Sequence, residues 1–274
     1  MLVNNLSLFI RAMAVFSVIA LAAPPLNGNP AAALVESPSP AISKNAPAFA
    51  PGERLTYNVS WSNVFSAGTS VMEVLGEKSE DGRPLLLFRS TAKSIGVVDR
   101  FYPVKDVVES LVDPRTFESI SYHLDQSHGS RKRKRTLVFD HQHRTVTYTM
   151  NGSREVFDIP EHTLDALSAL YYVRAKEPLE IGRTIVVPIH DSGKNWTVEI
   201  FVLKKEKVET PAGTFNTVMV KTYPKYEGVF MHKGEIFMWL TDDNRKIPVQ
   251  MKSTITIGSV MATLTEMKLG DEAR

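Results

Sequence analysis

The sequence predicts an all-β protein with a curved, mostly antiparallel, barrel-like or spiral sheet and one packed helix. Short segments in which apolar and polar residues alternate fill most of the chain, and this period of two is typical of strands with one buried face. Turn-forming pairs such as Asp81-Gly82, Asp113-Pro114 and Asn151-Gly152 separate these segments, as expected for hairpins. Helical spacing is convincing in a single segment.

Ordered structure is expected to begin at Pro51-Gly52-Glu53, because the alternating residues Leu55, Tyr57, Val59 and Trp61 follow directly. The expected strands occupy residues 55–61, 69–75, 85–91, 104–112, 117–124, 136–139, 144–150, 155–159, 184–189, 196–203, 205–210, 214–223, 234–240, 248–257 and 260–267. So many short strands fit a sandwich, a barrel or a curved sheet.

The one expected helix covers residues 163–174. Leu164, Leu167, Leu170 and Tyr171 fall at helical spacing and form an apolar stripe. A single amphipathic helix among strands plugs a barrel mouth or packs across a concave sheet. We therefore interpret the stripe as a cover for the core rather than as a ligand-binding element.

The N-terminal region predicts export. Residues 1–23 read as a secretory signal peptide, since Arg11 precedes an apolar run that ends in small residues and is too short to span a bilayer. Cleavage after Ala23 or near Ala33 and an uncleaved anchor all stay open. No cysteine is available for lipid attachment, so a periplasmic protein that is not a lipoprotein is expected. Residues 24–50 are rich in Pro, Ala, Ser and Asn and predict a flexible tether.

Residues 51–270 are expected to form a single domain. A chain of this length can bury enough apolar surface to fold without disulfides. The formal net charge of +2 falls to about +1 when Arg11 leaves with the signal peptide. This near-neutral balance gives no support to nucleic-acid binding or to a membrane-surface role of the molecule as a whole.

Several motifs, taken in order along the chain, carry a family resemblance. They are Pro51-Gly52-Glu53, Ala67-Gly68, Tyr102 with Val104, Asp106 and Glu109-Ser110, the helix at 165–174, Ala212-Gly213-Thr214-Phe215, Trp239-Leu240-Thr241-Asp242-Asp243-Asn244-Arg245 with Pro248-Val249, and Ile257-Gly258-Ser259. The chain resembles exported bacterial proteins classed as domain of unknown function 3108 (DUF3108), over nearly all of residues 51–269. The resemblance implies an all-β periplasmic protein without established catalytic residues.

The sharpest local pattern contains Trp239, Asp242, Asp243 and Arg245. Two adjacent carboxylates suggest acid–base chemistry or a divalent cation, but neighbouring side chains on an extended segment point to opposite sides. Asp and Asn are also common turn formers, because their side chains accept hydrogen bonds from nearby backbone amides. We favour a turn with a capped bend; a metal or catalytic site is the alternative.

Four histidines lie close together in the sequence: His123, His128, His141 and His143. In an extended segment His141 and His143 share one face, which is how a metal site can begin. No nearby carboxylate or cysteine is expected to complete the pattern. Solvent-facing hairpin residues are therefore the favoured interpretation, and no metal is expected.

A dense basic run precedes the apolar residues 137–139; it consists of Arg131, Lys132, Arg133, Lys134 and Arg135. In an exported protein such a run suggests contact with anionic lipid head groups or an acidic envelope polymer. The alternative is an edge strand that positive charge protects against edge-to-edge pairing. Both interpretations stay open at this point.

The sequence lacks several common catalytic motifs. It has no Gly-x-Ser-x-Gly elbow, no cysteine nucleophile and no phosphate-binding glycine loop, and Asp106 with Glu109 is only a weak carboxylate pair. We expect a non-enzymatic cell-envelope protein that uses no cofactor and binds a lipid or other apolar ligand, or a partner protein. A metal- or carboxylate-dependent envelope hydrolase is the alternative.

Overall fold

The computed structural model describes residues 47–61, 65–80, 83–226, 229–230, 236–254 and 259–270. The expected signal peptide, residues 24–46 of the expected tether, the Asp81-Gly82 turn and Ile257-Gly258 lie outside the described residues.

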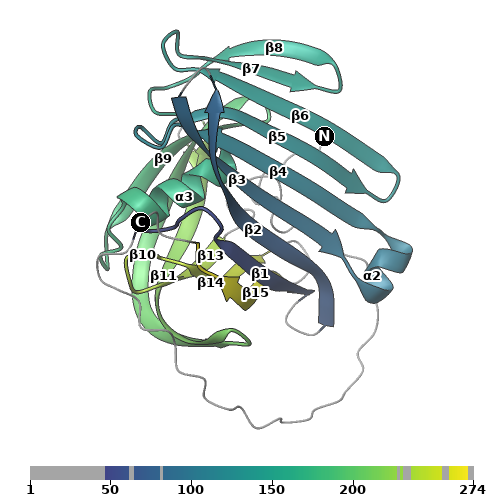
Figure 1. The fold of residues 1–274 in the computed structure, drawn as a ribbon, viewed down its shortest axis with the longest axis vertical. Coiled ribbons are helices and arrows are strands. Elements are labelled where there is room, and N and C mark those ends of the chain that lie inside the picture. Colours follow the sequence, from purple (N-terminus) through teal and green to yellow (C-terminus); the bar gives the residue numbers. More distant parts are fainter. Residues whose placement is uncertain are drawn as a thin grey trace.

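The strands form one sheet in which every ladder is antiparallel (Figure 1). They are β1 (Arg54–Trp61), β2 (Phe65–Glu80), β3 (Arg83–Ser94), β4 (Val104–Val112), β5 (Ser119–His128), β6 (Arg131–Asp140), β7 (Thr145–Met150), β8 (Ser153–Asp158), β9 (Thr184–Asp191), β10 (Lys194–Thr210), β11 (Gly213–Tyr226), β12 (Val229–Phe230), β13 (Ile236–Thr241), β14 (Pro248–Thr254) and β15 (Ser259–Lys268). Their spatial order is β8-β7-β6-β5-β4-β3-β2-β1-β15-β14-β13-β11-β10-β9, with β12 beside β11. The predicted fold class is confirmed.

The sheet curls, but its two end strands, β8 and β9, do not pair with each other. Side chains bring the ends together instead: Asn195 donates from Nδ2 to the carbonyl of Asp158 at 2.7 Å, and the rings of Phe157 and His190 lie 5.4 Å apart. The closure of the barrel therefore depends on polar and aromatic contacts rather than on a continuous ladder.

Helix α3 (Ala166–Lys176) lies inside the curl of the sheet (Figure 1). It packs against β3 and β4 and also against β9, strands that are far apart in the sheet order, so the sheet must wrap around it. The helix begins at the N-cap Asp165, whose carboxylate accepts the backbone amides of Leu167 and Ser168. The expected helix is thus present, but it begins and ends slightly later than the predicted bounds of 163–174.

An aromatic cluster joins α3 to the sheet. Tyr171 stacks on Phe88 of β3 with ring centroids 3.8 Å apart, and Phe49 meets Tyr171 edge-on at 5.1 Å. Phe49 belongs to the last residues of the segment expected to be a tether. The packed chain therefore begins a few residues before Pro51.

Several predicted elements differ from the structure in their bounds, and three differences matter most. Helix α2 (Gly96–Phe101) was not expected, because six residues are too few to show helical periodicity. Residues 196–203 and 205–210 form the single strand β10, in which a register shift between Val202 and Lys204 interrupts the alternation. Strand β6 begins at Arg131, so the basic run lies inside a strand rather than before one.

Candidate functional site

The segment between β13 and β14 forms a bend organised by Asp243. One carboxylate oxygen, Oδ1, accepts from Oγ1 of Thr241 at 2.8 Å and from the amides of Arg245 and Lys246 at 2.9 and 3.1 Å. Asp242 points elsewhere and pairs with Lys205 at 2.7 Å. The two adjacent carboxylates have separate structural partners, which agrees with the interpretation as a capped bend.

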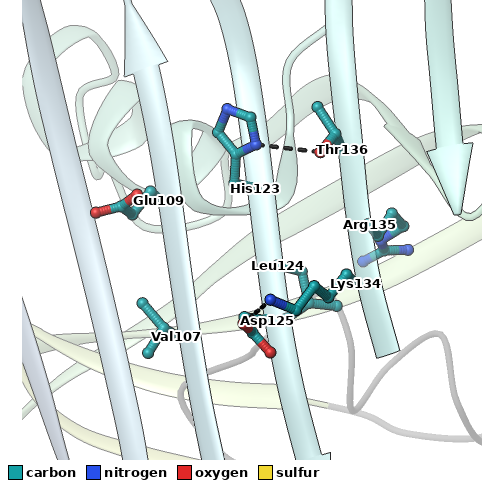
Figure 2. A pocket seen from close by; sticks show the side chains of 8 residues that line it. All are labelled: Val107, Glu109, His123, Leu124, Asp125, Lys134, Arg135 and Thr136. Carbon is teal, nitrogen blue, oxygen red and sulfur yellow. Dashed lines mark hydrogen bonds and ion pairs between the residues drawn. The ribbon is translucent and has the colours of Figure 1, made fainter. Parts of the chain in front are cut away.

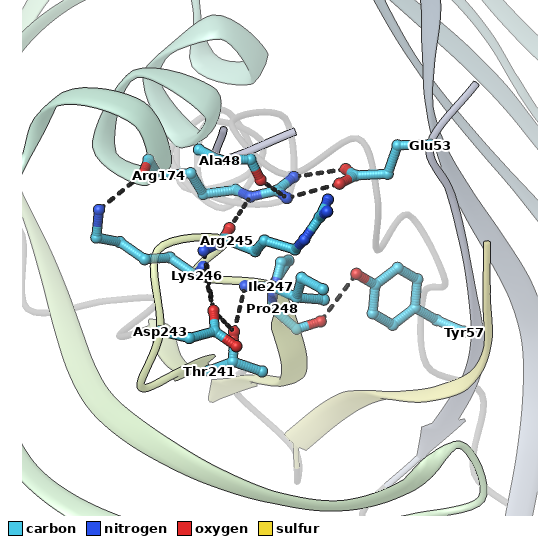
Figure 3. A network of polar contacts seen from close by, with 10 residues as sticks. All are labelled: Ala48, Glu53, Tyr57, Arg174, Thr241, Asp243, Arg245, Lys246, Ile247 and Pro248. Atoms are coloured by element: carbon cyan, nitrogen blue, oxygen red, sulfur yellow. Dashed lines mark hydrogen bonds and ion pairs between the residues drawn. The ribbon is translucent and has the colours of Figure 1, made fainter. Parts of the chain in front are cut away.

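The bend lies beside a buried ion pair between Arg174 of α3 and Glu53 (Figure 3). The guanidinium donates to both carboxylate oxygens, at 2.8 and 2.9 Å, and also to the backbone carbonyls of Arg245 and Ala48. Three motifs that are distant in the sequence therefore converge here: the start of β1, the helix and the β13–β14 bend.

Two further contacts complete this network. Lys246 donates from Nζ to the carbonyl of Arg174 at 2.9 Å, and the hydroxyl of Tyr57 donates to the carbonyl of Pro248 at 2.8 Å. Burial by itself lowers the pKa of Arg174, but the charge and hydrogen bond of Glu53, together with the nearby Tyr171 and Tyr57, raise the pKa overall, so the guanidinium stays charged. Through the Arg174–Glu53 ion pair and these hydrogen bonds, the network joins the elements around α3.

Each histidine of the sequence cluster has its own partner. These contacts are His123 Nδ1 with Thr136 Oγ1 (3.1 Å), His128 Nε2 with the Asp106 carboxylate (3.0 Å), His141 Nε2 with the Ser119 carbonyl (2.7 Å) and His143 Nδ1 with Asp140 Oδ2 (2.7 Å). Single carboxylates pair with His128 and His143, and the interpretation as solvent-facing hairpin residues is wrong for His128, which is buried against Asp106. In the part of the chain that the structure describes, no three acidic or histidine side chains group as metal ligands.

The carboxylates of Asp106 and Glu109 do not converge. They are three residues apart on β4, and positions separated by an odd number point to opposite faces of a strand. Asp106 is buried on the concave side with His128, whereas Glu109 pairs with Arg89 at 2.6 Å on the outer side. This arrangement does not provide the facing pair that glycoside hydrolysis requires.

A recess of about 200 Å³ lies on the outer side of β4, β5 and β6 (Figure 2). It is lined by Val107, Glu109, His123, Leu124, Asp125, Lys134, Arg135 and Thr136. The acidic members are already engaged, because Glu109 pairs with Arg89 and Asp125 with Lys134. The recess therefore offers a surface on which the acidic groups are neutralised by basic partners.

The basic run does not form a single surface patch. Because it lies in β6, its side chains alternate between the two faces of the sheet. Arg135 faces the interior, where its side chain is 3% exposed and pairs with Asp191 at 2.6 Å. Burial by itself lowers the pKa of Arg135, but the Asp191 charge together with the nearby Tyr122 and Tyr148 raises it overall. The interpretation that Arg135 contacts an anionic surface is thus wrong, while Arg131, Lys132 and Lys134 are exposed. The alternative of a protected edge strand is wrong as well, because β6 pairs with both β5 and β7.

Register brings a row of lysines together on the outer face. Lys93 of β3 pairs with Lys105 of β4, which pairs with Ser127 of β5, which in turn pairs with Lys132 of β6. All three lysines are exposed. Lys93 and Lys105 lie directly opposite each other, and like charges in this position destabilise a sheet.

Helix α2 connects β3 to β4 next to this row (Figure 1). Val97 and Phe101 are 73% and 74% exposed, and because they are four residues apart on a helix they share one face. Arg100 is exposed as well. Ser94 holds the helix in place by donating from Oγ to Oδ1 of Asp99 at 2.6 Å.

The start of the basic run reaches the same end of the sheet. The β5–β6 turn packs on the residue that follows α2, since a Cβ on Gly129 would lie 3.2 Å from a ring carbon of Tyr102. We call this region the basic end; it comprises Val97, Phe101, Lys93, Arg100, Lys105, Arg131 and Lys132. Asp99 is the acidic residue of α2 within it. Sequence reasoning found Arg131 and Lys132 but missed the rest, because register alone brings the lysines together.

None of the helices in the described ranges is long and apolar enough to cross a bilayer. In comparisons with known proteins, the family model described as "Protein of unknown function (DUF3108)" matches residues 56–265. No curated protein matches the chain closely enough to count as a relative.

One solved structure supports the fold. The chain is similar to a crystal structure of a β-barrel-like protein of domain of unknown function DUF1849 from Brucella abortus, with 9% identity and a TM-score of 0.55 over 82% of this chain and 100% of that one. A weaker likeness is to a candidate exported protein with a YmcC-like fold from Bacteroides fragilis, with 13% identity and a TM-score of 0.34 over 81% of this chain and 100% of that one. Another is to a candidate lipoprotein from Parabacteroides distasonis, with 12% identity and a TM-score of 0.38 over 81% of this chain and 98% of that one.

Proposed function

Because this chain belongs to the DUF3108 family of proteins of unknown function, we propose a role from its own geometry: it is a non-enzymatic cell-envelope protein that binds anionic membrane surfaces through the basic end. The periplasm as the location of this membrane contact rests on the expected signal peptide at residues 1–23. The contact is peripheral, with α2 touching the lipid head groups.

The exposure of Val97 and Phe101 beside a row of lysines carries this proposal. Two large apolar side chains held in water are unfavourable, and burying each one contributes about 1.5–3 kcal/mol. Each cation close to an anionic bilayer adds about 1 kcal/mol. Stable attachment generally needs two such signals, and the basic end combines an apolar tip with clustered positive charge.

An apolar ligand inside the curl of the sheet is the competing proposal. Helix α3 and the stacked rings of Tyr171 and Phe88 fill that region, so an acyl chain would have to displace packed side chains. The hydrolase alternative is not favoured either, because Asp106 and Glu109 lie on opposite faces of β4. A surface contact needs no rearrangement of the core.

Vesicle flotation tests the proposal. We expect the protein to float with phosphatidylglycerol vesicles but not with phosphatidylcholine vesicles at low ionic strength. Raising the ionic strength from about 0.01 M to 1 M shortens the Debye length from about 30 to 3 Å and should release most of the protein. Any contribution of residues 1–23 is common to wild type and variants, so differences between them report on the basic end.

Two variants separate the charged and apolar contributions. Replacement of Lys93, Lys105 and Lys132 by Gln should reduce binding at least tenfold, and Val97→Ser with Phe101→Ser should reduce it even at low salt. The matched controls, which should bind as wild type does, are Gln at Lys204, Lys205 and Lys207 of β10, and Val186→Ser of β9, where the valine is 57% exposed. The proposal would be overturned if the controls lost as much vesicle binding as the variants, or if the wild type bound anionic and neutral vesicles equally well.

A further inference from the structure

Strand β8 is an edge of the sheet that is open except at its end, where the carbonyl of Asp158 accepts from Asn195. It ends the strand order, and of its six residues, Ser153–Asp158, all but Phe157 are exposed. An edge strand presents unpaired backbone amides and carbonyls that can template a further strand. The other edge is partly covered, because Leu164 bonds to the backbone of β9 through Pro188 and His190.

The turn before β8 determines which backbone groups face outward. Asn151 and Gly152 form a two-residue turn with φ of 51° and 90°, as in type I′ hairpins. In such a hairpin the flanking residues, Met150 and Ser153, exchange hydrogen bonds with each other. By alternation, Arg154, Val156 and Asp158 direct their amides and carbonyls away from β7. The carbonyl of Asp158 points away from β7 as expected, since it accepts a hydrogen bond from the Asn195 side chain at 2.7 Å.

In a pair of antiparallel β8 strands, these three residues of one copy are complementary in charge and shape to the same three residues of the other. When two copies of β8 run antiparallel with Val156 opposite Val156, Arg154 of each copy faces Asp158 of the other, on the same face of the sheet. Sliding one copy by two residues along the other in one direction places Glu155 opposite Glu155. Sliding it by two more residues places Arg154 opposite Arg154. A shift in the other direction puts Val156 opposite Asp158. Charge therefore selects a single register.

An apolar stripe leads to the centre of this contact. Val138 of β6, Thr147 of β7 and Val156 of β8 are direct cross-strand neighbours, and the two valines are 49% and 61% exposed. A second copy paired at Val156 would continue the stripe onto its own sheet. β-branched side chains at such positions pack well across neighbouring strands.

We propose that β8 pairs with β8 of a second copy of this chain in an antiparallel arrangement, with Val156 on the two-fold axis and Arg154–Asp158 ion pairs on both sides. The symmetry is closed, so the pairing produces a dimer and not a filament. The contact is smaller than standard stable interfaces, so the dimer forms in a concentration-dependent manner. This inference does not depend on the proposed membrane function.

Sedimentation velocity over a range of concentrations, without lipid, tests the proposal with a charge swap. Arg154→Asp alone and Asp158→Arg alone each place like charges opposite each other, and each should weaken dimerisation at least fivefold. The double variant restores opposite charges and should recover the dimer. Circular dichroism and thermal melting check that every variant is folded. Wild type that stays monomeric at all concentrations, or a double variant that is no better than the singles, overturns the proposal.

Cysteine crosslinking supplies an independent measurement, because the chain contains no cysteine of its own. In the proposed register Val156→Cys places two thiols on hydrogen-bonded partners, whose Cα atoms lie about 5.5 Å apart, within disulfide reach. Copper-phenanthroline oxidation should give a covalent dimer. Thr147→Cys, one strand further in on the same face, is the matched control and should stay monomeric; equal crosslinking of both variants contradicts the register.

Discussion

Arg174 and Glu53 form a two-point ion pair at 2.8 and 2.9 Å, with side chains that are 0% and 1% exposed. The pair joins the helix inside the sheet to the start of the first strand, residues separated by 121 positions in the sequence. A buried charge is tolerated only when it is paired and hydrogen-bonded, and here both carboxylate oxygens and several guanidinium nitrogens have partners.

Removal of one partner of this pair should destabilise the protein strongly. We expect Arg174→Met or Glu53→Leu to lower the free energy of unfolding by about 3–5 kcal/mol, because the remaining group stays buried without its partner. Urea denaturation measures the effect. Arg183→Met is the matched control: its pair with Glu177 is 41% exposed on the arginine side and should contribute no more than about 1 kcal/mol.

The double variant Arg174→Met with Glu53→Leu should lose less stability than the two single changes combined, since no unpaired charge then remains buried. Additive losses would contradict this description of the pair.

The two carboxylates of the β13–β14 bend should differ in importance. Asp243→Ala removes the acceptor for three hydrogen bonds and should cost about 1–3 kcal/mol of stability. Asp242→Ala removes one partly exposed ion pair and should cost less than about 1 kcal/mol. Thermal melting compares the variants. A calcium- or manganese-dependent rise in melting temperature that both substitutions abolish would instead favour the metal-site interpretation.

Two buried tyrosines should respond in opposite directions to loss of the hydroxyl. The hydroxyl of Tyr171 has no hydrogen-bond partner among the described residues, so Tyr171→Phe should raise the free energy of unfolding by about 1 kcal/mol or more. Tyr57 donates to the carbonyl of Pro248, so Tyr57→Phe should lower it by about 1 kcal/mol. Urea midpoints that shift in the same direction for both variants would contradict the assignment.

His190 should make stability depend on pH. Burial lowers the pKa of this imidazole below its ordinary value of 6.5, so the folded state holds it neutral and the unfolded state binds the proton more readily. The stabilising contribution is complete above the unfolded pKa and declines as the pH falls toward the lowered folded value. We expect the free energy of unfolding to decrease between about pH 7 and 5, and less steeply in His190→Gln. Equal slopes would rule out His190 as the source.

The strands and hairpins could be predicted because their signals are local. Alternation such as Val104, Val108 and Val112 on the buried face of β4 reflects the geometry of one extended segment. The boundaries failed where local signals were interrupted, as at the register shift within β10, or were too short, as in α2.

The candidate sites depend on contacts between distant segments. The basic run shows this best: its composition suggested one charged patch, but pairing within the sheet sends Arg135 to the interior and Lys132 into a row with Lys93 and Lys105. No property of residues 131–135 by themselves reveals that row. It follows from the order and register of four strands.

The amino-acid sequence by itself determined the all-β class, the single core helix and the family, because periodicity, turn chemistry and motif order are properties of the chain read along its length. Only the tertiary structure decided that Glu53, Arg174 and Asp243 lie together, that Val97 and Phe101 stay in solvent, and that β8 ends the sheet. These features depend on which distant segments pack together, and that choice is made by the summed burial and pairing of the whole chain.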